Sequence, residues 1–255
     1  MIHSGKWSVN TRMPKIRLDQ LLVQRELADS REQAQRLIRS GVVRVGDKVS
    51  EKPGHQFKDD VEVFVKQKEK YVSRGGLKIE GAHNQFNFNL KDTICLDIGS
   101  STGGFTDFML QHGASKVYAV NCGTNQLHYK LRDDLRVVVM ENTNARYITK
   151  DDIPDAADFC SIDTSFISLT KILPPLKDIM KPGGHIISLI KPQFEAGKDQ
   201  VGKGGVVRDP AIHEEVINKV WKFGTEELGF KWLELCTSPI TGPAGNIEFL
   251  AYWQV

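Results

Sequence analysis

Apolar residues recur at helical spacing early in the chain and then give way to valine-rich segments. Within residues 18–22 and 34–38 they fall at i, i+3 and i+4, which predicts two short amphipathic helices. Ser30 is a suitable N-cap for the second helix. Valines that recur between residues 42 and 65 predict a small sheet after the helices. Residues 15–66 are therefore expected to form a compact α+β module.

The apolar pattern becomes continuous in the second part of the chain. The strand-like runs are TICLDIG, KVYAV, RVVVME, ADFCSID, HIISLI and a final EFLAYW, separated by helix-like stretches. Continuous runs, in place of alternating ones, indicate a mostly parallel sheet covered by helices on both faces. The fold class expected is therefore α/β, with a doubly wound, Rossmann-like sheet. Strands at 231–237 and 247–253 are joined by the short loop SPITGPAGN, which predicts an antiparallel hairpin at the sheet edge.

The change of pattern divides the chain into domains. Residues 1–14 are expected to be an extension or disordered, and residues 15–66 to form the small N-terminal domain. The segment 67–77, QKEKYVSRGGL, is polar and then glycine-bearing, which suits a linker. The α/β domain is expected to occupy residues 78–255.

Composition and charge exclude several classes of protein. At 255 residues with 40% hydrophobic content, the chain has enough apolar residues for a buried core. No apolar run approaches the length of a bilayer span, and the first residues lack the apolar region of a secretory signal, so a cytoplasmic protein without membrane contact is expected. The four cysteines form no CxxC pair, so neither a disulfide framework nor a metal site is expected. The net charge of +2 is too small to indicate nucleic-acid binding by itself, so the distribution of charge matters.

Basic side chains gather on and beside the second predicted helix. They are suited to phosphate contacts, although a charged helix face is more often simply solvated. The segment RLDQLLVQRELADSREQAQRLIRSGVVRVGDKV resembles the RNA-binding domain first described in ribosomal protein S4. The resemblance implies recognition of structured RNA by this helix and the following loop, through shape and phosphates. The candidate RNA-binding residues are Arg17, Arg31, Arg36, Arg39, Arg44 and Lys48.

A glycine-bearing loop, DIGSSTGGF, ends the first strand of the predicted α/β sheet. Glycines at this point allow a loop to approach a ligand closely. Gly99, Gly103 and Gly104 are spaced GxxxGG, which differs from the GxGxxG of dinucleotide sites, and a Gly-Lys-Ser/Thr ending is missing. A ligand without a pyrophosphate is therefore favoured, and a tight turn with a purely structural role is the alternative.

The same loop resembles the motif by which class I methyltransferases hold the methionine part of S-adenosylmethionine (SAM), which implies SAM as the cofactor. The matching positions are Asp97, Gly99, Ser101, Gly103 and Gly104. Such enzymes usually place an acidic residue after the second strand, and Asn121 stands there, so weaker binding of the cofactor is expected. The candidate cofactor-binding residues are Asp97, Gly99, Ser100, Ser101, Thr102, Gly103, Gly104, Phe105, Asn121, Asn144 and Asp163.

The segment after the fourth strand limits the methyl acceptor. Enzymes that methylate exocyclic base nitrogens commonly share a Pro-Pro-Tyr/Phe type motif there, and this chain has SIDTSFISL. Methylation of a pyrimidine carbon would need an activated thiol, and Cys160 lies within the apolar strand. A ribose hydroxyl instead needs a base that removes its proton, and a lysine among other lysines and acids is suited to that role.

Two lysines and two acids stand at predicted strand or helix ends, which are expected to converge on one cleft. Each residue taken singly is more often a surface charge. Together, Lys78, Asp163, Lys191 and Glu248 match the Lys-Asp-Lys-Glu tetrad of FtsJ-like ribose 2′-O-methyltransferases. By this resemblance Lys191 is the general base and Asp163 orients it. Lys78 with Glu248 would position the ribose.

Longer strings narrow the resemblance to the TlyA-type subfamily, historically named haemolysins. They are YVSRGGLKIEGA, DIGSSTGGFTD, IDTSFISL, KPQFEAGKDQVGKGGVVRDP and SPITGPAGNIEFL, and the similarity runs from Lys15 to Val255. It implies 2′-O-methylation of ribosomal RNA, usually of cytidine, with ribosomal RNA or ribosomal subunits as the partner. A cytolysin and a non-catalytic RNA-binding assembly factor are the alternatives, the second because of Asn121. The glycine-rich loop EAGKDQVGKGGVVRD is expected either to close over the site or to be a flexible connection.

Overall fold

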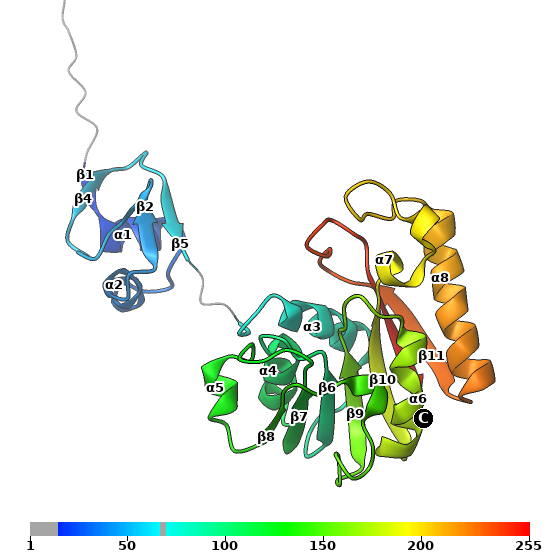
Figure 1. Ribbon diagram of the computed structural model, residues 1–255. Coiled ribbons are helices and arrows are strands. Elements are labelled where there is room, and N and C mark those ends of the chain that lie inside the picture. The colour runs from blue at the N-terminus through cyan, green and yellow to red at the C-terminus, as the bar shows by residue number, and fades with distance from the viewer. Residues whose placement is uncertain (1–14, 67–69) are drawn as a thin grey trace, which may run out of the picture. The chain divides into compact units, whose positions relative to one another are not determined.

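The computed structural model describes residues 15–66 and 70–255 of the chain. The chain divides into two compact units, one within the first 68 residues and one from residue 69 onward. Each unit has a hydrophobic core of its own, so each is described by itself (Figure 1).

The N-terminal unit packs two helices against short strands. Its elements are β1 (Lys15–Arg17), α1 (Leu18–Gln24), α2 (Arg31–Arg39), β2 (Val43–Val45), β3 (Lys48–Val49), β4 (Gln56–Lys58) and β5 (Val63–Val65). β2 pairs antiparallel with both β3 and β5, and β1 pairs antiparallel with β4. The predicted α+β module is confirmed. Strands β1 and β4 were not predicted, because they lack the valines that indicated β2 and β5.

The two helices of this unit form for the expected local reasons. The Ser30 hydroxyl accepts a hydrogen bond from the backbone N–H of Gln33 at 3.2 Å and caps α2. Leu18, Leu22 and Ile38 are fully buried where α1 and α2 face the core. Helices this short depend on such packing for their stability.

The second unit is built on one seven-stranded sheet in the order β11-β12-β10-β9-β6-β7-β8. The strands are β6 (Ile94–Ile98), β7 (Lys116–Val120), β8 (Val137–Met140), β9 (Ala157–Ile162), β10 (Met180–Ile190), β11 (Lys231–Thr237) and β12 (Phe249–Gln254). Neighbours from β8 through β10 pair parallel, and β12 pairs antiparallel with both β10 and β11. The mostly parallel sheet and the antiparallel terminal hairpin are thus confirmed.

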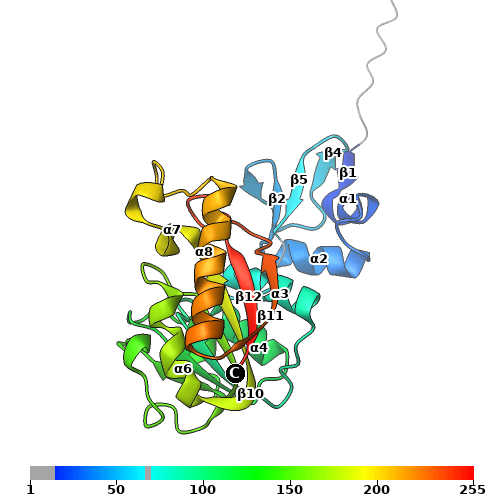
Figure 2. The same ribbon diagram turned by 90° about the vertical axis from the view of Figure 1, so that its right-hand side faces the viewer.

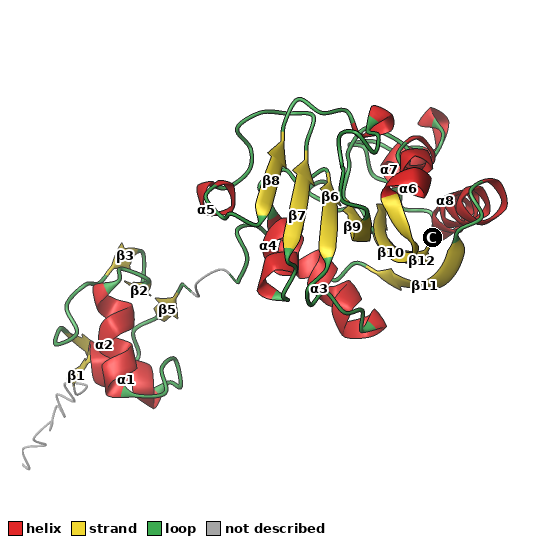
Figure 3. Ribbon diagram, turned by 90° about the horizontal axis from the view of Figure 1, so that it is seen from below, coloured by secondary structure: helices red, strands yellow, loops and turns green. Residues whose placement is uncertain are grey.

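Helices cover both faces of this sheet, as Figure 3 shows. The α-helices are α3 (Gly75–Phe86), α4 (Gly104–Gln111), α5 (Tyr129–Arg132), α6 (Leu173–Ile179), α7 (Pro192–Glu195) and α8 (Pro210–Lys222). Shorter 3₁₀ turns are η1 (Ala145–Tyr147), η2 (Leu169–Lys171) and η3 (Lys198–Gln200), and a π-helical turn, η4 (Phe223–Glu227), follows α8.

The two faces of the sheet bury different cores. Helices α3 and α4 pack on one face, and α6 and α8 pack on the other, where α8 runs beside β11 and β12 (Figure 2). Successive strand residues point to opposite faces, so Cys95 belongs to the first core and Leu96 to the second. This double burial is the physical reason for the continuous apolar runs in the sequence.

Part of the segment expected to be a linker belongs to the second unit. Tyr71 is buried in the core beneath α3 and α4, and α3 already begins at Gly75. A Cβ atom at Gly76 would collide with the Tyr71 ring, so glycine permits this close contact. In residues 70–77, the polar and glycine-bearing pattern therefore reflects tight packing at the start of α3.

The glycine-rich loop that precedes α8 is packed in its second half. Val206 and Val207 are buried, and the Asn246 side chain accepts a hydrogen bond from the Val207 N–H and donates one to the Gly205 carbonyl, each at 2.9 Å. Across the parts of the chain that the structure describes, no helix has both the length and the apolar content needed to cross a membrane.

Candidate active site

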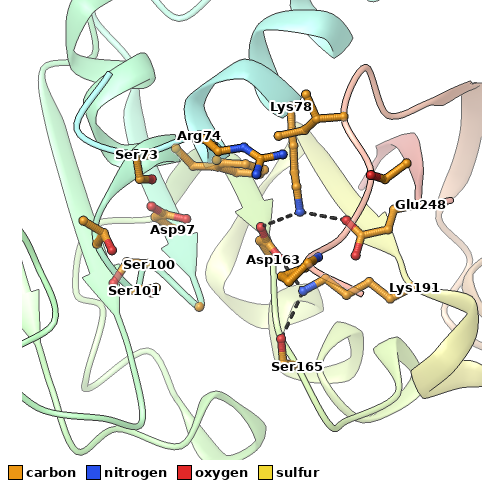
Figure 4. Close-up of a pocket in the computed structure, with 18 residues that line it drawn as sticks. Ser73, Arg74, Lys78, Asp97, Ser100, Ser101, Asp163, Ser165, Lys191 and Glu248 are labelled. Carbon is orange, nitrogen blue, oxygen red and sulfur yellow. Dashed lines mark hydrogen bonds and ion pairs between the residues drawn. The ribbon is translucent and has the colours of Figure 1, made fainter. Parts of the chain in front are cut away.

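Four charged side chains meet at one edge of the sheet of the second unit. Lys78 lies in the first turn of α3, Asp163 directly follows β9, Lys191 directly follows β10, and Glu248 directly precedes β12. Strands β9 and β10 are adjacent and parallel, so their carboxyl ends meet, and the start of the antiparallel β12 lies at the same edge. Figure 4 shows the four side chains pointing toward one another.

These four side chains form a continuous chain of ion pairs. Lys78 Nζ lies 2.7 Å from Glu248 Oε2 and 3.5 Å from Asp163 Oδ2. Lys191 Nζ lies 2.5 Å from Asp163 Oδ1 and donates a hydrogen bond to Ser165 Oγ at 3.2 Å. Asp163 is therefore shared between two ammonium groups, one on each carboxylate oxygen.

The group is withdrawn from solvent. Lys78, Lys191 and Glu248 are 8%, 7% and 1% exposed. Charged side chains are rarely buried to this degree unless they are paired, and here two positive and two negative groups balance. The pairing fixes where each polar atom stands, which is what a reaction centre requires.

A cavity of about 350 Å³ opens beside this group. Lys78, Asp163, Lys191 and Glu248 all line it, together with most of the glycine-bearing loop. A second cavity, of about 630 Å³, shares Gly99, Ser101, Asp163 and Ser165 with the first. The shared residues make the two cavities neighbours across the carboxyl ends of β6 and β9.

Gly99 brings the glycine-bearing loop against the end of β9. It has φ +83°, and a Cβ atom there would collide with the carbonyl oxygen of Asp163. Gly103, with φ +99°, is different because a Cβ atom there would strike Leu127 and Leu131, and it does not line either cavity. Gly103 therefore serves the packing of the loop, whereas Gly99 serves the close approach at the site.

Asp97 is the acidic residue at the bottom of the first cavity. It is fully buried and accepts hydrogen bonds from Thr106 Oγ1 at 2.6 Å and Ser161 Oγ at 3.0 Å. Burial raises the pKa of Asp97 to about 6, because two hydroxyl donors only partly replace the water lost by the carboxylate. A cation bound in the cavity would favour the ionised form.

Two asparagines line the second cavity. The amide nitrogen of Asn121 is buried and has no hydrogen-bond partner among the residues described. Asn144 uses its oxygen to accept from the Arg146 N–H at 3.2 Å, which caps η1. An unpaired buried donor beside an open cavity is the feature expected where a ligand supplies hydroxyl or ring acceptors.

The residues present fit SAM on these observations. The first cavity offers a carboxylate and a close-approach glycine loop for the amino-acid part, and the second offers an unpaired amide for the nucleoside part. All candidate cofactor residues except Gly103 line one cavity or the other. The first cavity has further lining residues that the sequence did not single out, which are Ser73, Arg74, Gly75, Ser165, Ile240, Thr241 and Pro243. Ser165 sits in the SIDTSFISL string, two residues after Asp163, and that position was its only sequence signal.

The chemistry of a cysteine nucleophile receives no support from the geometry. Burial raises the pKa of the Cys160 thiol well above its ordinary value, which disfavours the reactive thiolate. Among the residues described, no three His, Cys, Asp or Glu side chains gather as ligands for a metal ion.

The candidate RNA-binding residues behave as two sets. Arg17 and Arg31 converge on the buried carboxylate of Asp19. The others are exposed, and in the described N-terminal unit none of them pairs with Asp19: Arg36, Arg39, Arg44 and Lys48. Asp19 itself was not predicted from the sequence.

Comparison with known proteins identifies both units. The model of the FtsJ-like methyltransferase family matches residues 71–254, and that of the S4 domain matches residues 16–63. The chain is 51% identical over 240 residues to the "Putative rRNA methyltransferase YqxC" of Bacillus subtilis, which covers 93% of this chain and 85% of that protein. It is 41% identical over 240 residues to the "16S/23S rRNA (cytidine-2'-O)-methyltransferase TlyA" of Mycobacterium tuberculosis, with 93% and 89% covered.

Solved structures agree with the fold. A putative hemolysin from Streptococcus thermophilus is 49% identical, with a TM-score of 0.72 over 95% of this chain and 89% of that one. A putative methyltransferase complexed with SAH, the demethylated cofactor, shares the fold alone, at 13% identity and a TM-score of 0.50, over 70% of this chain and 50% of that one. The chain therefore belongs to the FtsJ-like methyltransferase family and carries an S4 domain ahead of its methyltransferase domain.

Proposed function

We propose that this protein transfers a methyl group from SAM to a ribose 2′-hydroxyl of ribosomal RNA, with cytidine as the target nucleoside. Because ribosomal RNA is the substrate, the reaction takes place in the cytoplasm. The observation that carries the proposal is the series of ion pairs Glu248–Lys78–Asp163–Lys191. It lies beside two adjoining cavities suited to SAM. The choice of cytidine rests on the name of the 41% identical relative, a cytidine-2'-O-methyltransferase.

Lys191 is the general base in this proposal. A hydroxyl is a poor nucleophile, so its proton must leave as the new bond to carbon forms. SAM, when bound, would supply an electrophilic methyl carbon: the bond from this carbon to the ribose oxygen forms as its bond to the positively charged sulfur breaks, and SAH is the leaving group. The Lys191 ammonium group first releases a proton to solvent; its Nζ then takes the hydroxyl proton, and the ammonium group that is restored is held by Asp163 at 2.5 Å.

The other members of the group orient the reacting atoms. Asp163 lines both cavities, so it stands where the nucleoside side and the acceptor side meet. Lys78 is tied to Glu248 at 2.7 Å and presents a fixed positive charge to the first cavity. A hydroxyl held between these groups can approach the methyl group along one line, and that restriction is worth several orders of magnitude in rate.

The test is methyl transfer from labelled SAM to ribosomal subunits isolated from a strain that lacks the protein. We expect label at a discrete ribose, mapped as a 2′-O-methyl site. Lys191→Ala should lower kcat by about 10³-fold, within the usual range for loss of a general base. Binding of SAM or SAH, measured by calorimetry, should stay within about threefold of the original.

Lys191→Arg is the matched control. Arginine keeps the positive charge but does not release its proton in proteins, so it should be as inactive as Lys191→Ala. An active Lys191→Arg variant would show that Lys191 contributes charge only. A wild-type protein that binds SAM but labels neither subunit would instead indicate a non-catalytic RNA-binding factor, and release of haemoglobin by the purified protein alone would indicate a cytolysin.

A further inference from the structure

Asp19 is a fully buried carboxylate at the start of α1, and three side chains converge on it. Arg17 donates from Nε at 3.0 Å to Oδ1 and from Nη2 at 2.8 Å to Oδ2. Arg31 Nε donates at 3.1 Å and Gln35 Nε2 at 3.0 Å, both to Oδ2. Asp19 is 0% exposed, whereas the side chains of Arg17 and Arg31 are 38% and 48% exposed.

The arrangement leaves part of each guanidinium group free. Arg31 contacts Asp19 through Nε alone, and within residues 15–66 both of its terminal nitrogens have no protein partner. Arg17 likewise keeps Nη1 unpaired among these residues, at a place where its guanidinium lies over the backbone of Gly54. Free N–H groups of the two arginines around the buried Asp19 carboxylate therefore remain available to bind a ligand.

The carboxylate offsets the repulsion between the two arginines. The hydrogen bond from Arg17 is the main reason that the pKa of Asp19 lies far below its usual range, and the bonds from Gln35 and Arg31 add to it. Asp19 is thus ionised at any pH at which the protein works. Two cations and one anion leave a net charge of +1 that is carried by ordered, half-exposed groups.

We propose that Asp19 is a positioning residue for RNA binding, and that it holds Arg17 and Arg31 as a preformed pair for one phosphodiester group of the substrate. Arginine suits this task because its planar fork matches two oxygens of a phosphate. Ordering two long side chains before binding removes an entropy cost that RNA would otherwise have to offset. The inference rests on the proposed action on ribosomal RNA and names a contact within it.

The remaining basic candidates lack such a partner. Arg36, Arg39 and Arg44 are exposed and do not contact Asp19 in the described unit. Arg44 donates a hydrogen bond to the Asp47 carbonyl at 2.9 Å, whereas Arg36 and Arg39 have no such bond among the described residues, so Arg36 and Arg39 should each contribute less to RNA affinity than Arg17 or Arg31.

The test uses Asp19→Asn in the full-length protein, with binding to the isolated ribosomal subunits as the readout. Charge alone predicts tighter binding, because the substitution removes a negative group from an RNA-binding surface. If Asp19 positions the two arginines, Asp19→Asn should instead weaken binding to the ribosomal subunits by about tenfold. Asp60→Asn, which removes an exposed carboxylate from the same unit, is the matched control and should bind as tightly as the original or slightly more tightly.

A double-mutant cycle separates positioning from a loss of folding. Arg31→Ala should weaken binding strongly in the original protein and much less in the Asp19→Asn background, whereas Arg39→Ala should cost the same in both. Loss of the Arg39→Ala effect in Asp19→Asn would mean that the unit has unfolded, and the positioning role would be withdrawn. Unchanged or tighter binding by Asp19→Asn would also overturn it, while the proposed function would stand as long as the wild-type protein methylates ribosomal RNA.

Discussion

Asp19 and Asp97 are both screened from solvent, but the pKa values of their carboxyl groups shift in opposite directions, because their hydrogen-bond donors and their depth within the protein differ. Asp19 receives hydrogen bonds from two guanidinium groups, which favour the ionised form and hold its pKa far below the ordinary range. Asp97 receives hydrogen bonds from two neutral hydroxyls, and burial raises its pKa to about 6. The Asp19 carboxylate therefore stays ionised and anchors two arginines, whereas the Asp97 carboxyl group ionises only as the pH rises past about 6.

The raised pKa of Asp97 predicts a specific pH dependence of stability. The folded value, about 6, lies above the ordinary value of 3.8, so ionisation costs the folded state more than the unfolded one. The free energy of unfolding should therefore fall between about pH 4 and pH 6 by roughly 3 kcal/mol from this residue and then level off. Urea unfolding without cofactor, compared between Asp97→Asn and the original protein, should show a difference that grows over this range. A difference that is constant from pH 4 to pH 8 would refute the assignment.

At the scale of elements, the segments after β9 and β10 are joined side by side. Lys191 contacts Asp163 and Ser165, and the rings of Phe194 and Phe166 have centroids 4.8 Å apart. Glu195 adds a further link between the two segments, because it accepts hydrogen bonds from the Ser168 hydroxyl and from a backbone N–H of η2. These contacts set the distance between Lys191, the proposed general base, and Asp163.

Removal of Glu195 should loosen this junction. Glu195→Ala leaves the buried N–H of Leu169 and the hydroxyl of Ser168 without their acceptor, which should lower the free energy of unfolding by about 2 to 4 kcal/mol. Glu195→Gln keeps one acceptor oxygen and should lose about half of that. Because the Lys191–Asp163 geometry depends on the junction, kcat should fall more than the KM for SAM rises.

The exposed Glu214 provides the control for this prediction, since Glu214→Gln makes the same chemical change on the surface of α8. It should leave both stability and kcat unchanged. An unaltered kcat in a folded Glu195→Ala protein would show that the junction is not needed for the position of Lys191.

At the scale of the whole molecule, the two units differ greatly in the size of their cores. Among the described residues, the core of the N-terminal unit holds eight buried hydrophobic residues, whereas two clusters of 23 and 22 buried residues cover the faces of the large sheet. A core in a unit of this size rarely contributes more than about 3 to 5 kcal/mol. The small unit is therefore the part of the protein most sensitive to a loss of packing.

A cavity in the core of the N-terminal unit should separate binding to ribosomal subunits from binding of the cofactor. Leu22→Ala removes a fully buried side chain and should cost about 2 to 5 kcal/mol, enough to unfold most of the unit. We expect binding to ribosomal subunits to be lost and SAH binding, measured by calorimetry, to be retained. Val49→Ala, at a half-exposed position of the same unit, should affect neither. Loss of SAH binding by Leu22→Ala would show that the methyltransferase unit depends on the folded S4 unit.

The sequence by itself determined the features that depend on local pattern. Continuous apolar runs predicted the strands from β6 to β10 and β12, since strands buried on both faces have no polar alternation. Ser30 predicted the start of α2, and the DIGSSTGGF loop predicted a position that lines a cavity in the structure, because a cap and a tight glycine turn involve neighbouring residues only. The family resemblance selected Lys78, Asp163, Lys191 and Glu248 before any geometry was known.

Only the tertiary structure decided how distant residues combine. It placed Glu248 within 2.7 Å of Lys78 across 170 positions of the chain, through the insertion of β12 between β10 and β11. It also placed Tyr71, expected in the linker, in the core, left Gly103 out of the glycines that line the cavity, and gathered Arg17 and Arg31 around Asp19. Such outcomes depend on strand order and on which side chains meet after folding, and no period or spacing in a single sequence encodes those long-range contacts.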